Sequence, residues 1–507
     1  MRALRRVVGA AFLLFSAVPP FRLSAQTSAS EPVRLTMQEA VRRALQYGEE
    51  VQLARSTVQQ ARGQVTEAFA GALPEIRGSV TYQRTFASVF GGGGSGTTLD
   101  PFAPDTNASL GDRVRYLEDE YPNNLPRGLS DLFAATPFGR ENTYTAAITV
   151  QQTLFQGGKV GAGLRGARAY ERAARAQLEE TQQDVVYRVK QAYMNALFAQ
   201  RMLDIAEGGK ALSDEQLRRV QLNHQVGSSA DYDLLRAEVE SANQEPQVIA
   251  ARNTRDLALL EVRRLVNIAP GQAVELDAGI LAASDSLPVV DLVVLDAEIA
   301  SRAALQAAQA TLDFRRQVVR VYRGDLYPAL RFNMSYGGQA FPSGTFPSGG
   351  DFRRDWTASL SLSMPLFDGF RTRGRVEQAR AELDRAELQL AQTRESVGIE
   401  VEQARAEMLR ARALVSARRQ TVTQAVRAHH LASVRYANGI AAALEVSDAR
   451  LAMQQSRVNE AQATRDYLLA IAGLERALGR TVPVQAVERR AEAQTRGGDQ
   501  NSGEQLP

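Results

Sequence analysis

Apolar residues recur along this chain with two different periods, and the two periods alternate in a fixed order. Residues 34–72 carry apolar side chains at helical spacing, with a break at Tyr47-Gly48, until Pro74 ends the pattern. Residues 74–84 and 143–155 instead alternate apolar with polar side chains, which is typical of strands with one apolar and one wet face. The chain therefore starts with helices followed by two strands.

A long segment between these strands is rich in Gly, Pro, Asn and Asp, including Gly91 to Gly94, and predicts an exposed loop. Beyond Gly157-Gly158, helical spacing continues without proline to about residue 225, which at ~1.5 Å per residue is on the order of 100 Å. After Gly227 a returning helix covers about 232–266, with a kink expected at Pro246. Residues 159–267 thus predict a long helical hairpin, and 271–289 a linker.

The same order of elements then occurs a second time. Strands are expected at about 328–336 and 356–367, followed by a helical hairpin at 371–478. Leu154-Phe155-Gln156-Gly157 matches Leu366-Phe367-Asp368-Gly369, and Gly227 matches Gly439, both at an offset of 212. Residues 31–270 and 290–483 are therefore two structural repeats, and the polar tail at 484–507 is predicted to be disordered.

The second long helix carries a coiled-coil seam. Its apolar positions step by three and four residues from Ala379 to Val415, with many alanines. This pattern predicts close packing against a neighbouring helix.

The composition limits where the protein can be located in the cell and which kinds of functional site it can contain. The 60 basic and 57 acidic residues give a net charge of +3, and their interleaving along helices argues against nucleic-acid binding. The absence of cysteine excludes disulfides, thiolate metal sites and cysteine nucleophiles. Residues 1–25 read as a signal peptide, with Arg2, Arg5 and Arg6 before an apolar run and a small-residue site at Ser24-Ala25.

No apolar run of about twenty residues follows the signal, so any membrane crossing must use strands. Each predicted strand is close to the length that a tilted strand needs to cross a bilayer. Four strands cannot close a barrel, so either they belong to a soluble sandwich or several chains contribute to one barrel. The Ser, Thr, Gln and Asn of the polar face suit a wet lumen, and Trp356, Tyr144 and Tyr336 lie near strand ends, where interfacial aromatic residues occur.

The doubled order of strand, strand, very long helix, glycine turn and returning helix resembles the TolC-like outer membrane efflux protein family. The resemblance covers about 33–483 and is carried by the repeated Leu-Phe-x-Gly junctions, by Leu73-Pro74 and Tyr327-Pro328 before strands, and by Tyr436-x-x-Gly439 followed by Glu445-Val446-x-Asp448.

This resemblance implies an α+β membrane protein that forms a homotrimer. Each chain would donate four strands to a twelve-stranded outer membrane β-barrel, continued by a long α-helical periplasmic barrel of coiled coils. The implied function is the exit duct of a tripartite efflux pump, which passively conducts small toxic compounds and opens at its periplasmic helix ends. The implied partners are a periplasmic adaptor protein, an inner membrane transporter and outer membrane lipid, with no cofactor.

Three acidic residues are candidates for the periplasmic aperture: Glu445, Asp448 and Asp233. In a trimer each carboxylate would be repeated three times around a narrow pore, giving rings that favour cations. The alternative is a solvated helix start, where acids complement the helix dipole. Some relatives close the aperture by pairing an acid at the Asp233 position with a basic residue after the second glycine. Here that residue is Ala441, and Arg219, Arg435 or Arg236 could substitute.

The two glycine turns are candidates for adaptor contact. Glycine permits a positive φ between antiparallel helices, so a turn without any partner also explains the pattern. The resemblance implies that the helix tips meet the adaptor through Val226, Gly227, Ser228, Ser229, Asn438, Gly439 and Ile440.

No enzymatic motif appears in the sequence. There is no Walker loop, HExxH or nucleophile elbow, and His429-His430 lacks further ligands at metal spacing, so an enzyme and a metal site are not expected. Two alternatives to the efflux duct stay open: the outer membrane component of a type I protein secretion system, and, from a different class, a periplasmic coiled-coil adaptor.

Overall fold

The computed structural model describes residues 33–86, 105–119, 141–269, 271–277, 289–290, 302–342, 344–480 and 484–485. The predicted signal peptide at 1–25 and most of the predicted first loop, including Gly91 to Gly94, lie outside these ranges. Among the described helices, none combines the length and the apolar character needed to cross a membrane.

Four strands form one antiparallel sheet in the order β2 (Glu75–Arg84), β3 (Asn142–Gln156), β6 (Ala329–Ala340) and β7 (Phe352–Ser363). Directly paired residues share a face of the sheet, as with Tyr82 beside Tyr144 and Tyr336 beside Trp356. The alternation in each strand therefore places the apolar side chains on one face and the Ser, Thr, Gln and Asn side chains on the other.

The last strand lies earlier in the sequence than the predicted 356–367. β7 begins and ends four residues before those bounds, and just beyond its end Pro365 has no backbone N–H for the ladder. β6 extends to Ala340 through Gly337, where a Cβ atom would lie 2.4 Å from the carbonyl oxygen of Ala146. The connection between the two predicted strands, 337–355, therefore shortens to 341–351.

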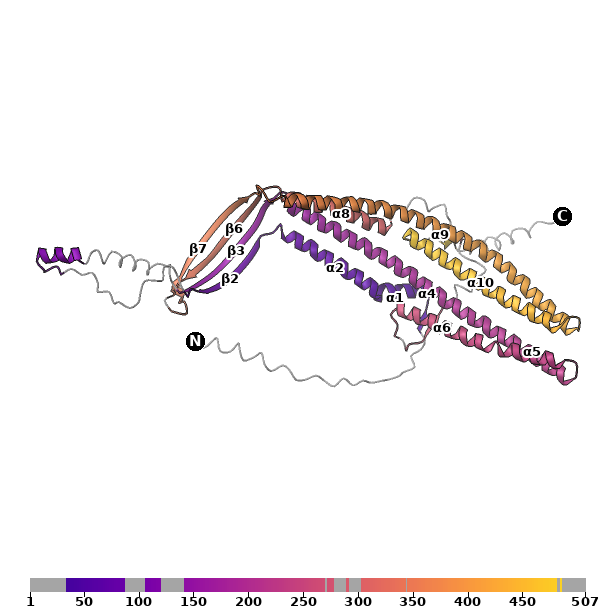
Figure 1. Cartoon of the computed structure of the whole chain (residues 1–507). Coiled ribbons are helices and arrows are strands. Elements are labelled where there is room, and N and C mark those ends of the chain that lie inside the picture. The colour runs from indigo at the N-terminus through magenta and orange to yellow at the C-terminus, as the bar shows by residue number, and fades with distance from the viewer. Residues whose placement is uncertain are drawn as a thin grey trace, which may run out of the picture.

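Each strand continues into one row of helices. α2 (Glu49–Ala70) leads into β2, β3 into α4 (Lys159–Gln225), α8 (Ala303–Gly324) into β6, and β7 into α9 (Arg371–Ala437). α5 (Asp231–Ala242) and α6 (Glu245–Leu265) return beside α4, and α10 (Ala443–Leu478) returns beside α9. α2 and α6 pack against α4, α4 packs against α8 and α10, and these two pack against α9. The order of the helices across the layer therefore follows the order of the strands in the sheet. Figure 1 shows the strands at one end and both hairpin turns at the other.

The predicted coiled-coil seam of α9 is confirmed. The seam residues Val397, Val401, Met408, Ala411 and Val415 are all buried. From Val401 onward they pack in one cluster with Tyr467 and Leu474 of α10.

A buried arginine joins three helix rows where α10 ends and α8 begins. Arg302 is 4 % exposed, and its guanidinium lies 3.1 Å from Glu180 of α4 and 2.6 Å from Glu400 of α9. It also donates to the carbonyl oxygen of Ala477, in the last turn of α10, where a cation complements the helix dipole.

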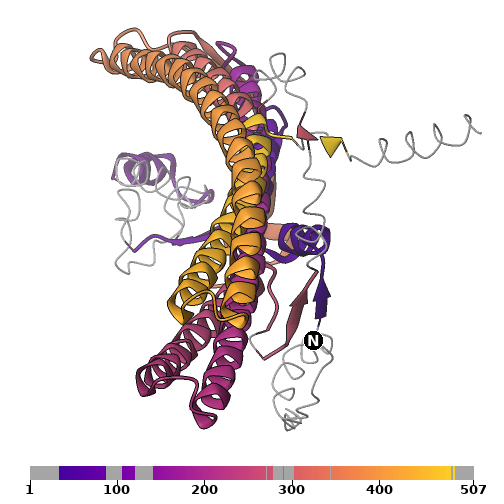
Figure 2. The same cartoon turned by 90° about the vertical axis from the view of Figure 1, so that its right-hand side faces the viewer.

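Two small sheets lie beside the helical layer (Figure 2). β1 (Val33–Leu35), just before α1 (Met37–Tyr47), pairs in parallel with β4 (Val274–Leu276), and β5 (Val289–Val290) pairs with β8 (Val484–Gln485). β4 thus lies within the expected linker and β8 opens the expected tail. The buried hydroxyl of Tyr193 in α4 lies 2.8 Å from the carbonyl oxygen of Leu35 and 3.0 Å from that of Asp277, and burial raises its pKa to about 12.

Candidate functional site at the hairpin ends

The two hairpins, α4 with α5–α6 (the first hairpin) and α9 with α10 (the second hairpin), end in the same turn. Gly227 has φ +77° and Gly439 has φ +72°. In each turn the glycine N–H and the next N–H donate back into the last helical turn, to His224 and Asn223 in the first and to Tyr436 and Arg435 in the second. This pattern is the Schellman motif, in which glycine is favoured because it has no Cβ.

The predicted tip residues are accessible in the single chain. Val226 is 71 % and Ile440 is 69 % exposed, although both are apolar. Gly227, Ser228, Asn438 and Gly439 are exposed too, and Ser229 is partly buried. The tips therefore present an apolar side chain within polar surroundings at each hairpin end.

The three predicted acids lie close to these turns but on different hairpins. Glu445 lies in the first turn of α10, with Asp448 one turn further along, and both are exposed. Glu445 is 3.4 Å from Arg435 across the turn of its own hairpin. Asp233 lies in the first turn of α5, on the first hairpin, and is partly buried.

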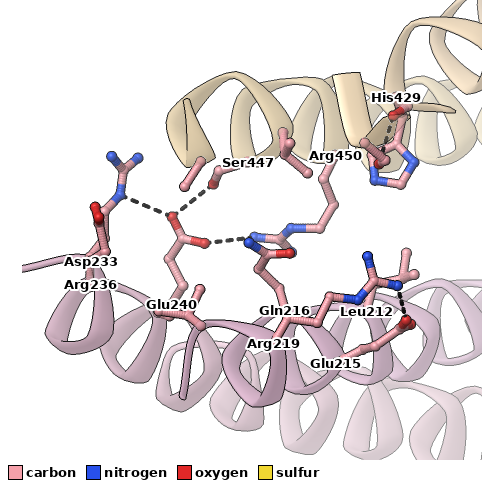
Figure 3. A pocket seen from close by; sticks show the side chains of 15 residues that line it. Leu212, Glu215, Gln216, Arg219, Asp233, Arg236, Glu240, His429, Ser447 and Arg450 are labelled. Atoms are coloured by element: carbon pink, nitrogen blue, oxygen red, sulfur yellow. Dashed lines mark hydrogen bonds and ion pairs between the residues drawn. The ribbon is translucent and has the colours of Figure 1, made fainter. Parts of the chain in front are cut away.

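A polar cluster missed from the sequence joins the two hairpins. The Ser447 hydroxyl of α10 donates to Glu240 of α5 at 2.7 Å, and the Arg450 guanidinium of α10 lies 3.5 Å from the same carboxylate. Figure 3 shows Glu240 pointing from the first hairpin toward both residues, with Arg236 of its own helix, 3.4 Å away, on its other side. We call Glu240, Ser447 and Arg450 the hairpin latch.

Two of the three latch residues are buried, and Glu240 is partly buried. Arg450 is 4 % and Ser447 8 % exposed, and Nη1 of Arg450 is buried without a hydrogen-bond partner among the described residues. A cavity of about 120 Å³ lies beside it, lined by both hairpins. Because a buried charge that loses its partner is costly, Arg450 strongly favours the arrangement in which Glu240 is present.

His429 of α9 lines the same cavity from the second hairpin. Burial lowers its pKa, and the nearby cations Arg450 and Arg457 lower it further, followed by His430. His429 is therefore held in the neutral form near pH 7, and its protonation would place a third positive charge near the two arginines.

None of the three arginines considered as replacements for a basic residue at 441 joins the hairpins. Arg435 pairs with Glu445 within the second hairpin, and Arg219 pairs with Glu215 within α4. Arg236 pairs with Glu240 within α5.

The sequence does contain a signal for the latch. Val446, Arg450 and Met453 are all buried and follow helical spacing, so Arg450 occupies an apolar seam position of α10. A charge at such a position needs a partner on the facing helix, and that partner is Glu240.

The described residues contain no group of three or more His, Asp or Glu side chains placed to hold a metal ion. The polar chemistry at the hairpin ends consists of ion pairs and hydrogen bonds.

Comparison with known proteins places this arrangement among outer membrane channels. Residues 40–267 and 294–480 both match the family model "Outer membrane efflux protein", so each repeat matches separately. The outer membrane protein TolC of Vibrio cholerae is 24 % identical over 66 % of this chain and 76 % of its own length. The alkaline protease secretion protein AprF of Pseudomonas aeruginosa is 25 % identical over 70 % of this chain and 74 % of its own length.

The fold agrees with a solved structure as well. The outer membrane protein VceC of Vibrio cholerae superposes with a TM-score of 0.67 at 18 % identity, over 88 % of this chain and 96 % of that one. The predicted α+β fold with its tandem repeat, the outer membrane location and the role in efflux are confirmed by these matches. The chain belongs to the outer membrane efflux protein family.

Proposed function

We propose that three copies of this chain close one twelve-stranded barrel and one helical tunnel, which form the exit duct of a tripartite efflux pump. The duct conducts small toxic compounds passively, without an enzymatic step. The observation that carries this proposal is the pair of open lateral edges of the chain, one formed by β2 with α2 and α6, the other by β7 with α9.

The strand edges need a second copy. β2 and β7 each have a single neighbour in the sheet, and every residue of both strands is exposed in the single chain. In lipid each unpaired backbone group costs several kcal/mol, so an open edge is not a stable end state. Pairing β7 of one copy with β2 of the next removes every edge when the ring closes.

The helix edges support the same ring. Apolar side chains are exposed on α9, including Leu388 (71 %) and Leu431 (59 %), and on the opposite edge, including Leu53 of α2 (69 %) and Ile249 of α6 (59 %). These edges continue the strand edges, because α2 leads into β2 and β7 leads into α9. Two different, complementary edges give a head-to-tail contact, which closes into a ring.

The gate of the duct lies at the hairpin ends. We assign Glu445, Asp448 and Asp233 to the periplasmic aperture, where threefold repetition gives acidic rings that favour cations. The hairpin latch holds the second hairpin against the first, and opening requires Arg450 to leave Glu240. The exposed tips at 226–229 and 438–440 contact a periplasmic adaptor, which links the duct to an inner membrane transporter.

Protein export is the second candidate cargo for the same duct. The similarity to AprF, which is named for alkaline protease secretion, favours it specifically. A role as a periplasmic adaptor is disfavoured because such a protein has no use for four strands that each present one apolar face.

The aperture is tested in planar bilayers with the double variant Glu445→Gln, Asp448→Asn. We expect the purified trimer to lose much of its preference for cations, while Glu67→Gln, on an exposed position of α2 at the far end of the helices, leaves it unchanged. Unchanged selectivity in the double variant would refute the aperture assignment. A soluble monomer released by osmotic shock, in place of a membrane-bound trimer, would refute the duct itself.

A further inference from the structure

The apolar face of β7 contains one charge. Phe352, Trp356, Ala358, Leu360 and Leu362 occupy this face, and Arg354 lies between the first two of them. The side chain is exposed, and the described residues offer it no ion-pair partner. A guanidinium on a face otherwise suited to lipid requires a partner or a position near the membrane surface, because charges facing the interior of the bilayer are unfavourable.

The register shows what surrounds Arg354. Its row across the sheet is formed by small or short side chains, Gly338 of β6, Ala146 of β3 and Val80 of β2. The neighbouring rows are aromatic: Tyr82, Tyr144 and Phe352 on one side, Tyr336 and Trp356 on the other. Arg354 therefore lies at one end of a shallow row between two aromatic borders.

This row lies at the end of the sheet remote from the helices. β7 begins at Phe352 and reaches the helical part only after Ser363, so Arg354 is near the distal end, which is the external end in the proposed duct. Aromatic girdles mark the level of lipid head groups in membrane barrels. At that level the charged groups available to a lipid-facing side chain are those of the outer leaflet lipids.

We propose that Arg354 binds a phosphate group of a phosphorylated outer-leaflet lipid, with its acyl chains against the apolar face of β6 and β7. The proposal rests on the proposed barrel. Arginine matches phosphate because its planar guanidinium donates two parallel hydrogen bonds to the phosphate oxygens. The only acid adjacent to Arg354 in sequence, Asp355, lies on the opposite face of the strand.

A second arginine would reach the same place when the ring closes. Arg84 ends β2 at the same distal end and on the same face as Tyr82 and Val80. Pairing of β7 with β2 of the next copy brings the outer ends of these edges together, so each seam carries Arg354 from one copy and Arg84 from the other. Arg84 is 3.6 Å from Glu141, whose carboxylate offsets the positive charge of Arg84, so Arg354 is the main determinant.

The test uses the full-length trimer in detergent, titrated with diphosphoryl lipid A and followed by native mass spectrometry. We expect Arg354→Gln to weaken binding about tenfold or more, since the neutral amide cannot supply the charge-assisted pair of hydrogen bonds that the guanidinium donates to phosphate. Arg353→Gln is the matched control, because Arg353 is the adjacent residue and faces the polar side. Arg354→Lys should recover part of the affinity.

Each outcome decides the proposal. Equal weakening by Arg353→Gln, unchanged binding by Arg354→Gln, or equal binding of dephosphorylated lipid A would overturn it. Inorganic phosphate that competes as well as lipid A at equal concentration would also overturn the lipid assignment. Trimers of both variants are first verified on an unboiled gel. If the unmodified chain forms no trimer, it is the proposed duct that fails.

Discussion

The two hairpins share a turn but differ in their returning arms. α10 runs unbroken for 36 residues, whereas the return of the first hairpin breaks at Asn243-Gln244 into α5 and α6, with Pro246 at the start of α6. A proline at that position cannot donate to the preceding turn, so the helix is interrupted there. The returning arm of the second hairpin is therefore one continuous helix, and that of the first consists of two shorter helices.

The break between α5 and α6 lies beside a contact between α4 and the Gln454 side chain of α10. Gly209 of α4 lies so close to Gln454 of α10 that a Cβ atom would come within 1.7 Å of its amide nitrogen, and Gln244 borders the same point. Further from the tips, Leu468 of α10 packs in an apolar cluster with Val189 and Leu197 of α4. The hairpins are thus joined by polar contacts near the tips and, further from the tips, by an apolar cluster together with ion pairs such as Lys190–Glu475. The tips are therefore the end that can separate with the least loss of apolar contact.

Loss of the latch arginine is the largest expected effect. In Arg450→Met, Glu240 loses its cross-hairpin cation but keeps Arg236, and loss of this partly buried ion pair should cost about 1–3 kcal/mol of local stability. We expect faster amide hydrogen exchange in residues 231–242 and 443–450 and a larger open fraction in bilayer recordings.

The control for this variant is Arg219→Met, which removes a pair within α4 alone and should change exchange at the tips little. If the double variant Glu240→Gln, Arg450→Met is additive with the single changes, the two residues do not act together and the latch is wrong.

Two adjacent glycines give a sharper comparison of the hairpin contact. At Gly208 an added Cβ meets nothing within 4 Å, so Gly208→Ala should stabilise the helix by about 0.5–1 kcal/mol. At Gly209 the same methyl displaces the Gln454 amide, and we expect the helical gain to be cancelled or reversed. Thermal unfolding of the two variants measures the difference, and equal stabilisation would show that the polar contact is dispensable.

The sequence predicted the parts of the molecule that repeat. The offset of 212 residues, the strand alternation and the α9 seam identified the helical hairpins and the sheet, and Gly227 and Gly439 lie at the predicted turns. The latch was missed because it depends on which face of α5 meets α10. The spacing of apolar residues within one helix does not identify the residues that it contacts on another helix. Only the charge at seam position Arg450 pointed to it. The end of β7 was misplaced because its alternation continues past Ser363 to Pro365.

The smallest expected effect is a dependence of the latch on pH through His429. Burial first, and then Arg450, Arg457 and His430, lower its pKa in the folded chain, and the cavity also contains Arg219, Arg236, Glu215, Asp233 and Glu240. The unfolded chain therefore takes up this proton at a higher pH than the folded chain. The contribution of neutral His429 to the stability of the folded chain is present above about pH 6.5, and it is lost as the pH falls from there through the lower pKa of the folded chain. After correction for the intrinsic exchange rate, amide hydrogen exchange at the tips should accelerate as the pH is lowered from 7.5 to 5.5. His429→Gln should flatten this dependence on pH. His430→Gln, at the exposed neighbouring position, should change it less. An identical slope in His429→Gln would show that His429 does not cause the pH dependence, because a glutamine fills similar space without a titrating proton.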